Sequence, residues 1–267
     1  MVHLTLRAVT FLAPNMFPVY QFILQYLSQK LGCEIDFAVG ASYKEVDQAD
    51  LSFICGLPYV LNTSPRRNPA SIEALVAPVL QGERFQHRPI YFSDVIVHRD
   101  SPFQSFADLR GSSWAYNEPQ SQSGYGITRY WLVQKGETNG YFREVVQSGY
   151  HQKSIRMVCR HEVDASAVDA QVLAIEMRDH PHLAEKLRVI DSLGPSTIQP
   201  FAAANHLSRG LKQDIQVILT ELHHGPASHA YLDKGFIDRF VAVNDADYDD
   251  IRHMLAVCEE ADFLLLK

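Results

Sequence analysis

Residues 4–39 read LTLRAVTFLAPNMFPVYQFILQYLSQKLGCEIDFAV, in which a strand pattern, a helix pattern and a second strand pattern follow one another. Residues 4–11 predict the first strand and residues 35–39 the second. Between them, apolar side chains recur at helical spacing over residues 17–31, and Gly32 is a plausible helix stop. Strand and helix patterns that alternate in this way favour an α/β fold.

The same alternation extends along the rest of the chain. We expect further strands at residues 51–55, 90–98, 113–116 and 165–168, and further helices at residues 125–133, 171–178, 213–222 and 248–255. The remaining pattern consists of a turn over Gly56-Leu57-Pro58-Tyr59, one capped helical turn over residues 105–111, and a return connection over residues 189–190 and 198–203.

A central block of strands and helices lies between two outer blocks, which predicts two lobes joined by two crossing strands. We place lobe 1 at residues 1–94 plus 197–267, and lobe 2 at residues 95–196. With 267 residues and 46% apolar content, the chain can bury the core of one large domain or of two ordinary lobes. The clefts of bilobed proteins usually bind small ligands and close by a hinge.

The net charge of the chain limits the kinds of molecule that it is expected to bind. The formal net charge is −7, which argues against a nucleic-acid or anionic-membrane partner because both need a clustered basic surface. Residues 95–196 carry eleven Lys and Arg against twelve Asp and Glu, so this segment is close to neutral. No apolar run approaches the roughly 18 residues of a membrane span. The first residues, MVHLTLR, lack the basic and apolar regions of a secretory leader.

The cysteines and histidines give no metal signal. The thiols form no C-x-x-C pair, which predicts free buried thiols at Cys33, Cys55, Cys159 and Cys258. His161-Glu162 lacks the spacing of an H-E-x-x-H motif, and the short histidine pairs have no matched partners. We therefore expect no metal and no cofactor.

Ser121-Gln122-Ser123-Gly124-Tyr125 stands between a loop and an amphipathic segment. Two hydroxyls and the first-turn N–H groups of a helix would converge there, and the positive end of the helix dipole attracts phosphate-like groups. Serines beside a glycine can also approach a ligand closely. Because serines cap helices very often, these residues alone leave both an oxyanion site and a simple helix cap open.

A series of short motifs surrounds this stretch. In order along the chain they are Asp108-Leu109-Arg110-Gly111, Ala115, Pro119, Ser121, Ser123-Gly124-Tyr125, Arg129-Tyr130, Gly149-x-His151, Glu162-Val163-Asp164-Ala165 and Val168-Asp169. Two further matches lie upstream. Residues 51–60 form a strand and its turn, and Tyr91 begins the segment 91–97. This pattern resembles the phosphate, phosphite and phosphonate substrate-binding proteins of ABC transporters, well over residues 50–205 and by position elsewhere. The resemblance implies a two-lobed type II periplasmic-binding-protein fold.

The resemblance also implies ligand-binding roles. Ser121, Gln122, Ser123 and Gly124 would hold a small oxyanion through hydroxyl and backbone donors, because neutral donors at a helix N-terminus bind an anion without an arginine. His151 would add a donor that is strongest when protonated, although a capping or solvent-facing histidine is the alternative.

Two further residues complete the implied set. Tyr91 would contribute a hydroxyl or an apolar wall, unless it is ordinary packing at the start of a strand. A carboxylate repels an anion, so Asp169 would either accept a proton from a ligand P–OH group or order the loop.

Three departures from the family pattern bear on the ligand and the turns. Family members that bind aminophosphonates recognise the ammonium group with carboxylate side chains. Gln171 and Gln199 stand at the corresponding positions here. Since a neutral amide does not offset a cation, we expect a ligand without a positive amine: phosphate, phosphite or a simple alkylphosphonate. A short segment between residues 37 and 50 leaves Tyr43 as the nearest match to an expected aromatic residue. His161 replaces the family's usual glycine.

Other functions remain open from the sequence. Some bilobed proteins of menaquinone and thiamine-pyrimidine biosynthesis use the cleft as an active site, and a cytosolic location would favour that enzyme class. The chain has no G-x-S-x-G elbow and no phosphate-binding lysine loop, so binding for ABC-type uptake is preferred. A leaderless sensor is a third possibility. The family predicts a periplasmic or extracellular protein and an ABC permease as partner, whereas a start at Met1 predicts a cytoplasmic one.

Overall fold

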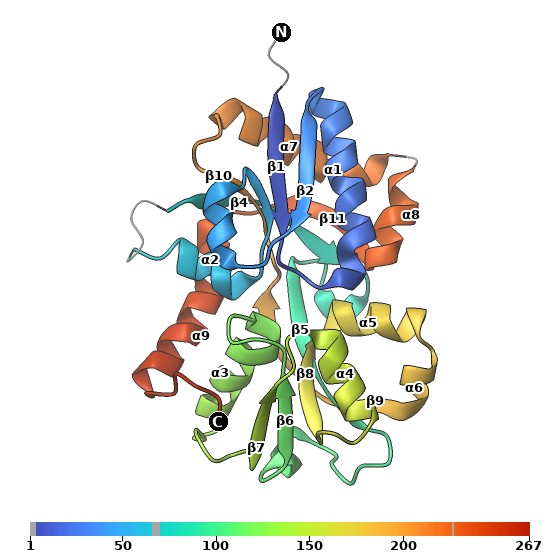
Figure 1. Ribbon diagram of the computed structural model, residues 1–267, viewed down its shortest axis with the longest axis vertical. Helices are drawn as coiled ribbons and strands as arrows, with labels where there is room; N and C mark the ends of the chain where they lie inside the picture. The colour runs from blue at the N-terminus through green and yellow to red at the C-terminus, as the bar shows by residue number, and fades with distance from the viewer. Residues whose placement is uncertain (1–3, 66–69, 226) are drawn as a thin grey trace. The chain divides into compact units, whose positions relative to one another are not determined.

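The computed structural model describes residues 4–65, 70–225 and 227–267, and it has the α/β architecture that the sequence predicts (Figure 1). The chain divides into two compact units. The first unit runs from the N-terminal strand to Ile90 and resumes over Thr197–Asp249, and the second comprises Tyr91–Ser196 and Asp250–Lys267. Within the described ranges, no helix combines the length and the apolar character that a membrane crossing requires.

The first unit is built on a six-stranded mixed sheet. In order across the sheet, the strands are β11 (Ile237–Ala242), β4 (Ile72–Leu80), β10 (Phe201–Ala204), β3 (Leu51–Phe53), β1 (Thr5–Thr10) and β2 (Glu34–Val39). Strand β1 is parallel to β2 and β3, whereas β10 and β11 run antiparallel to β4. The α-helices of this unit are α1 (Phe17–Leu31), α2 (Gly56–Asn62), α7 (Arg209–Thr220) and α8 (Ser228–Leu232).

Helix α1 follows directly from its sequence pattern. Its buried side chains recur at helical spacing, at Val19, Tyr20, Ile23, Leu24 and Leu27. Gly32 ends the helix in the left-handed conformation, with φ 64°, and its N–H donates to the carbonyl of Ser28. A residue with a Cβ atom would be strained at this φ, so the predicted helix stop is confirmed.

The second unit is built on a five-stranded sheet. In order, its strands are β7 (Glu144–Gln147), β6 (Ser113–Tyr116), β8 (Ala165–Asp169), β5 (Ile90–His98) and β9 (Leu187–Thr197). Strand β6 is parallel to β7 and β8, and β5 is antiparallel to β8. The helices are a π-helical turn (Gln122–Gly126), α3 (Ile127–Gln134), α4 (His151–Cys159), α5 (Ala170–Asp179), α6 (His182–Lys186) and α9 (Asp249–Glu260).

Short 3₁₀ segments cover many of the connections. They are Pro14–Met16, Tyr43–Gln48, Glu83–Phe85, Phe106–Leu109, Leu222–His224, Asp233–Gly235 and Asp245–Tyr248. The segment Phe106–Leu109 is the capped turn that the sequence predicts, because Ser105 and Asp108 form a capping box.

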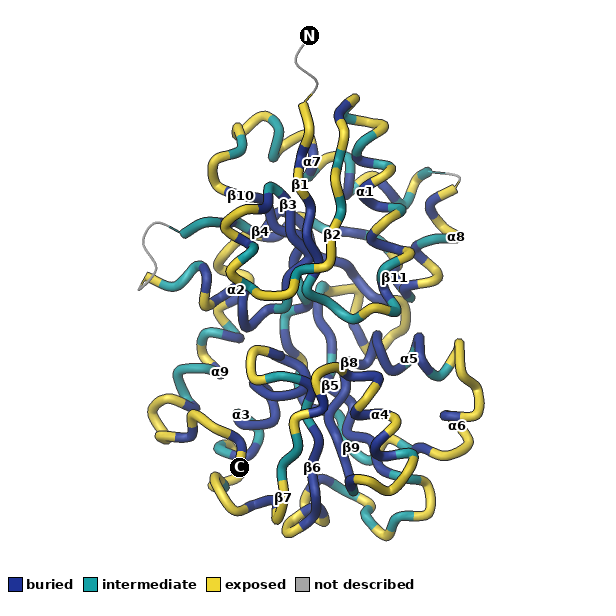
Figure 2. The backbone as a smooth tube through the Cα atoms, in the orientation of Figure 1, coloured by how far each residue is buried: buried dark blue, intermediate teal, exposed yellow. Residues whose placement is uncertain are grey.

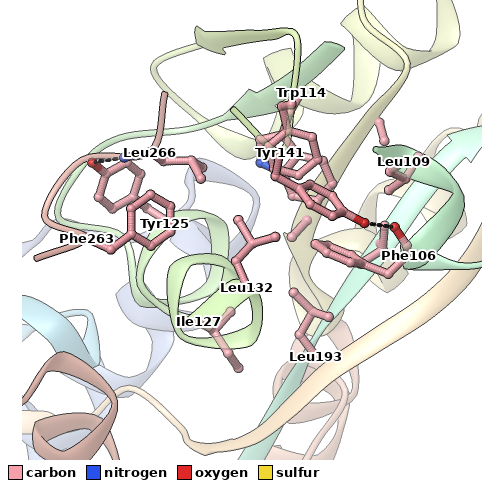
Figure 3. Packing of buried hydrophobic residues seen from close by; sticks show 14 of the residues in the cluster. Phe106, Leu109, Trp114, Tyr125, Ile127, Leu132, Tyr141, Leu193, Phe263 and Leu266 are labelled. Carbon is pink, nitrogen blue, oxygen red and sulfur yellow. Dashed lines mark hydrogen bonds between the residues drawn. The ribbon is translucent and has the colours of Figure 1, made fainter. Parts of the chain in front are cut away.

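The core of the second unit is rich in aromatic side chains (Figure 3). Trp114 stacks on Phe142 at a ring-centroid distance of 4.6 Å, and Phe106 stacks on Tyr141 at 5.6 Å. Strands β6 and β8 supply the middle of this core, and Figure 2 shows them buried along almost their whole length. Phe263 and Leu266, near the end of the chain, belong to the same cluster.

The C-terminal residues differ from the sequence-based division. Residues 250–267 were expected in lobe 1, but Asp250–Lys267 belongs to the second unit. The reason is packing, since Met254, Phe263 and Leu266 are buried in the core of that unit. The chain therefore passes between the units three times: within β5, at the end of β9, and at the start of α9.

Several elements were not predicted from the sequence. The segment Gly56–Asn62, expected to begin as a turn, is the helix α2. The strands β4, β7 and β11 and the helices α4, α6 and α8 had no prediction. All four cysteines are free, as predicted, but only Cys33 and Cys258 are buried.

His161 takes the conformation that a glycine would take. Its φ is 57°, and it follows the end of α4 at a turn in which the N–H of Glu162 donates to the carbonyl of Met157 at 2.9 Å. This bond closes the turn after a helix in the manner of a left-handed cap. The replacement of the family's glycine therefore leaves the turn geometry intact, at the cost of a side chain held in the left-handed region.

Candidate functional site

One edge of the second sheet collects the starts of three helices. The strands β6, β7 and β8 are parallel, so their carboxyl ends share an edge. The π-helical turn follows β6, α4 follows β7, and α5 follows β8. Strand β5 begins at the same edge, because Ser93 pairs with Asp169. First-turn N–H groups have no acceptor within their own helix, so three helix starts with their positive dipole ends gather here.

The serine stretch forms a π-helical turn at this edge. Ser121 is its N-cap, and the Ser121 Oγ atom accepts a hydrogen bond from the N–H of Gly124 at 3.0 Å. The N–H of Gly126 donates to the carbonyl of Ser121, which is the five-residue spacing of a π-helix. All residues from Ser121 to Gly126 are buried. The expected helix begins here, three residues earlier than predicted.

His151 joins the serines. It is the first residue of α4, and its Nε2 atom lies 2.9 Å from the Ser123 Oγ atom, which in turn lies 3.3 Å from the Ser121 Oγ atom. Burial lowers the pKa of His151 to about 4, so the ring is neutral at pH 7. The stronger, protonated form of this donor is therefore disfavoured at pH 7, and the neutral ring keeps one N–H group to donate.

Asp169 caps α5. Its Oδ1 atom accepts hydrogen bonds from the N–H groups of Gln171, at 2.8 Å, and Val172, at 3.3 Å. Burial raises the pKa of Asp169 to about 6, against the lowering effect of those two bonds, and the nearby carboxylate of Asp94 raises it further. The carboxylate orders the start of a helix, which is one of the two roles expected for it.

Gly124 is held between two polar side chains. A Cβ atom at this position would lie 2.0 Å from the Asn117 Oδ1 atom and 3.3 Å from the Cε1 atom of His151. The carbonyl of Asn117 accepts from the N–H of Gly149, which ties the loop after β6 to the loop before α4. The glycine therefore permits close packing of the serine turn against both loops.

The other predicted residues take several positions. Gln122 is buried, and its Nε2 group donates toward Met254 Sδ at 3.2 Å and Ser196 Oγ at 3.5 Å. Gln171 is buried in the first turn of α5, and Tyr91 is buried near the start of β5. Gln199 is half-buried between β9 and β10 and belongs to the first unit. The second unit thus contains every predicted ligand residue except Gln199.

The structure contains no Ser-His-Asp triad within its described residues. The Nδ1 atom of His151 is buried without a hydrogen-bond partner there, while the Asp169 Oδ1 atom accepts from backbone N–H groups. A triad needs the carboxylate to orient the imidazole, so His151 is not set up as a general base. Over the same residues, no three His, Cys, Asp or Glu side chains gather into a group that could hold a metal.

Sequence reasoning missed three polar side chains near this sheet edge. Asn117 follows β6, Gln152 follows His151 in α4, and Ser93 pairs with Asp169. Each is buried, and Asn117 Oδ1, Ser93 Oγ and both amide atoms of Gln152 have no hydrogen-bond partner among the described residues. Asn117 stood in a predicted turn before Pro119, which was the only signal, and Gln152 and Ser93 carry none.

The chain matches known proteins over most of its length. A family model described as "ABC transporter, phosphonate, periplasmic substrate-binding protein" matches residues 10–248. The phosphonates-binding periplasmic protein of Escherichia coli K12 is 22% identical over 251 residues, which covers 90% of this chain and 72% of that protein.

Solved structures show the same fold. A binding-protein component of an ABC phosphonate transporter from Pseudomonas aeruginosa has a TM-score of 0.83 and 17% identity, covering 97% of this chain and 88% of that one. PhnD1 from Prochlorococcus marinus, in complex with methylphosphonate, has a TM-score of 0.80 and 18% identity, covering 97% and 98%. The fold is the bilobed periplasmic-binding-protein fold, with two mixed sheets and strands that cross between the lobes.

Proposed function

Because the chain belongs to the family of periplasmic substrate-binding proteins of phosphonate ABC transporters, we propose that it captures a small phosphorus oxyanion at Ser121–Gly124 for an ABC permease. Family membership places it among transporter binding proteins rather than enzymes. The ligand class is phosphate, phosphite or a simple alkylphosphonate.

The observation that carries this proposal is the hydrogen-bond chain from His151 to the two serines. Ser121 Oγ already accepts from the N–H of Gly124, so its own proton is left for another acceptor. A neutral His151 with its proton on Nε2 donates to Ser123 Oγ. One hydroxyl proton then lies in the 3.3 Å contact between the two Oγ atoms, and the other is left over. That remaining hydroxyl proton is a donor to whatever binds beside the pair, and an oxyanion needs donors.

Helix starts take the place of a fixed cation. The π-helical turn, α4 and α5 each begin at this sheet edge, and a helix N-terminus is equivalent to roughly half a positive charge. Asp169 is the opposing charge, and its raised pKa of about 6 allows it to share a proton with a ligand P–OH group. Donors and dipoles of this kind bind phosphate without a lysine or arginine in contact.

The neutral amides of Gln171 and Gln199 favour a ligand that has no ammonium group. They stand where aminophosphonate-binding relatives have carboxylates, and a neutral amide does not compensate a buried ammonium. Gln171 is buried beside Asp169, its own N–H bonded to that carboxylate. The favoured ligands therefore carry a phosphorus oxyanion and no positive amine.

Thermal unfolding with added oxyanions tests the proposal. Phosphate, phosphite or methylphosphonate is expected to raise the melting temperature, since a ligand at a hundred times its Kd stabilises the fold by about 2.7 kcal/mol. Calorimetry then ranks these ligands against 2-aminoethylphosphonate, which we expect to bind more weakly. No shift with any of the oxyanions would overturn the oxyanion site, and tighter binding of the aminophosphonate would overturn the ligand class.

Serine substitutions locate the site. Ser121→Ala with Ser123→Ala removes both hydroxyl donors and is expected to abolish most of the ligand-induced shift. Ser105→Ala is the matched control, because Ser105 also caps a helical turn of the second unit, and its side chain bonds within that turn to Asp108. It is expected to lower the melting temperature slightly and to leave the ligand-induced shift unchanged.

A further inference from the structure

The C-terminal tail, residues 263–266, is fastened to the helix that carries the serine turn (Figure 3). The N–H of Leu266 donates to the Tyr125 hydroxyl at 3.0 Å, and that hydroxyl donates to the carbonyl of Leu264 at 3.5 Å. Phe263 and Leu266 are buried in the same core as Tyr125, whereas Leu264 and Leu265 are exposed. The tail is therefore held by its backbone as well as by two apolar side chains.

Arg129 reinforces this attachment from the next turn of the helix. Its guanidinium donates to the carbonyls of Phe263, at 3.1 Å, and Leu264, at 2.8 Å, and lies 4.8 Å from the ring of Tyr125. Arg129 is 4% exposed, and over the described residues no carboxylate pairs with it. A buried cation that relies on tail carbonyls makes the tail a required part of this helix, because loss of those partners leaves the charge unsatisfied.

A second contact joins the C-terminal segment to the turn itself. The Gln122 Nε2 group lies 3.2 Å from the Sδ atom of Met254, in helix α9. Residues 250–267 thus contact Gln122, Tyr125 and Arg129, which lie three or four positions apart along the helix. The turn has two other partners. Asn117 lies beside Gly124, and His151 lies within hydrogen-bond distance of Ser123.

A π-helical turn needs such support. The π-helix is rare and occurs mostly as single turns inside α-helices, frequently at functional sites. The turn Gln122–Gly126 runs directly into α3, which could continue the ordinary α-helical spacing toward the N-terminus. A change to that spacing would rotate Ser121 and Ser123 away from their present partners.

We propose that Tyr125 and Arg129 are positioning residues, through which the C-terminal tail holds the serine turn in its oxyanion-binding conformation. This inference rests on the proposed function and goes beyond it by assigning a binding role to residues that need not touch the ligand. The contacts of the tail then contribute to the free energy of ligand binding, although the tail need not touch the ligand.

Tyr125→Phe tests the inference with little change in packing. It removes the hydroxyl that bonds to Leu264 and Leu266 while it keeps the ring in the core. Tyr141→Phe is the matched control, because the Tyr141 hydroxyl donates to the carbonyl of Phe106 at 2.7 Å in the same core and does not contact the serine turn (Figure 3). Both variants are expected to lower the melting temperature by similar amounts.

The two variants are expected to differ in binding. By calorimetry with methylphosphonate, Tyr125→Phe should weaken the Kd by roughly threefold to tenfold, the worth of one or two buried hydrogen bonds. Tyr141→Phe should keep the wild-type Kd. An unchanged Kd in Tyr125→Phe, with the expected loss in melting temperature, would show that the tail only stabilises the fold.

Hydrogen exchange gives a test that needs no ligand. The amides of residues 122–126 should exchange faster in Tyr125→Phe than in the wild type, and at the wild-type rate in Tyr141→Phe. This result supports the positioning role even if no oxyanion binds the wild type, in which case the proposed function alone has failed. Equal exchange in both variants would overturn the inference.

Discussion

The Nε2 atom of His151 lies 2.9 Å from the Oγ atom of Ser123, although 28 positions separate the two residues in the sequence. Both side chains are buried, and the imidazole is the first residue of its helix. The positive end of a helix dipole and burial both disfavour an imidazolium, so this contact joins a hydroxyl to a neutral ring.

A neutral His151 predicts a pH-dependent stability. Its pKa is about 4 in the folded protein and about 6.5 when unfolded, so the unfolded state binds more protons between these values. The stability due to the neutral ring is complete above pH 6.5, is lost as the pH falls toward 4, and amounts to about 3 kcal/mol. Urea unfolding of His151→Gln from pH 4 to 7 should lack this contribution, so its stability should fall relative to that of the wild type as the pH rises. A variant with the same pH profile as the wild type would contradict the assignment.

Asp169 predicts a dependence of the opposite sign. Its pKa is about 6 in the folded protein, above the usual 3.8, so the folded state binds more protons in that window and loses stability as the pH rises through it. Asp169→Asn keeps an oxygen for the cap of α5 and should be more stable than the wild type at pH 7, by up to about 3 kcal/mol.

The two titrations overlap between about pH 4 and pH 6 and nearly cancel in the wild type. Each single variant should therefore show a steeper profile than the wild type across that range, with slopes of opposite sign. A lower free energy of unfolding for Asp169→Asn at pH 7 would show that its carboxylate is charged and well paired in the folded protein.

Gly124→Ala should damage the serine turn by steric overlap. The new methyl group would meet Asn117 Oδ1 at 2.0 Å, and overpacking of this kind costs about 1–3 kcal/mol. Chemical denaturation gives the loss, and Asn117→Ala in the same chain should recover part of it. Gly210→Ala is the control, since Gly210 lies in α7 with no atom near its missing Cβ, and this change should be neutral or slightly stabilising.

Gln171→Glu should change which phosphonate binds best. A carboxylate beside Asp169 repels every anionic ligand, and an ammonium group on the ligand compensates part of that repulsion. The ratio of the Kd for methylphosphonate to the Kd for 2-aminoethylphosphonate should rise by about tenfold or more, measured by calorimetry. Gln171→Met controls for loss of the amide without a new charge, and an equal rise in that variant would exclude a charge effect.

The sequence predicts those parts of the fold that local patterns determine. Helix α1 and Gly32, the strand β6 and the capped turn at Ser105 all lie where the residues indicate. Strand β4 had no prediction, because the apolar run Ile72–Leu80 suits a buried strand and a buried helix equally. Helix α4 had none because its N-cap, Tyr150, makes no capping hydrogen bond.

The site is only partly contained in the sequence. The serine stretch and the histidine were visible as motifs, but their contact depends on β7 lying parallel to β6, which brings His151 to the carboxyl edge of the sheet. The neutral state of His151 depends on burial. The attachment of the tail through Tyr125 and Arg129 joins residues more than 130 positions apart, which no local pattern reports.

The N-termini of the helices at the carboxyl edge of the second sheet also have a consequence for the association of an anionic ligand. The second unit has thirteen Lys and Arg against seventeen Asp and Glu, because the C-terminal segment adds to its acidity. Such a surface does not steer anions from a distance, whereas partial charges at helix ends act over a few ångströms. At the proposed site, capture would then depend on chance encounter and short-range contact, and added salt would have little long-range attraction to screen. We therefore expect a nearly constant affinity across ionic strengths and a slow association.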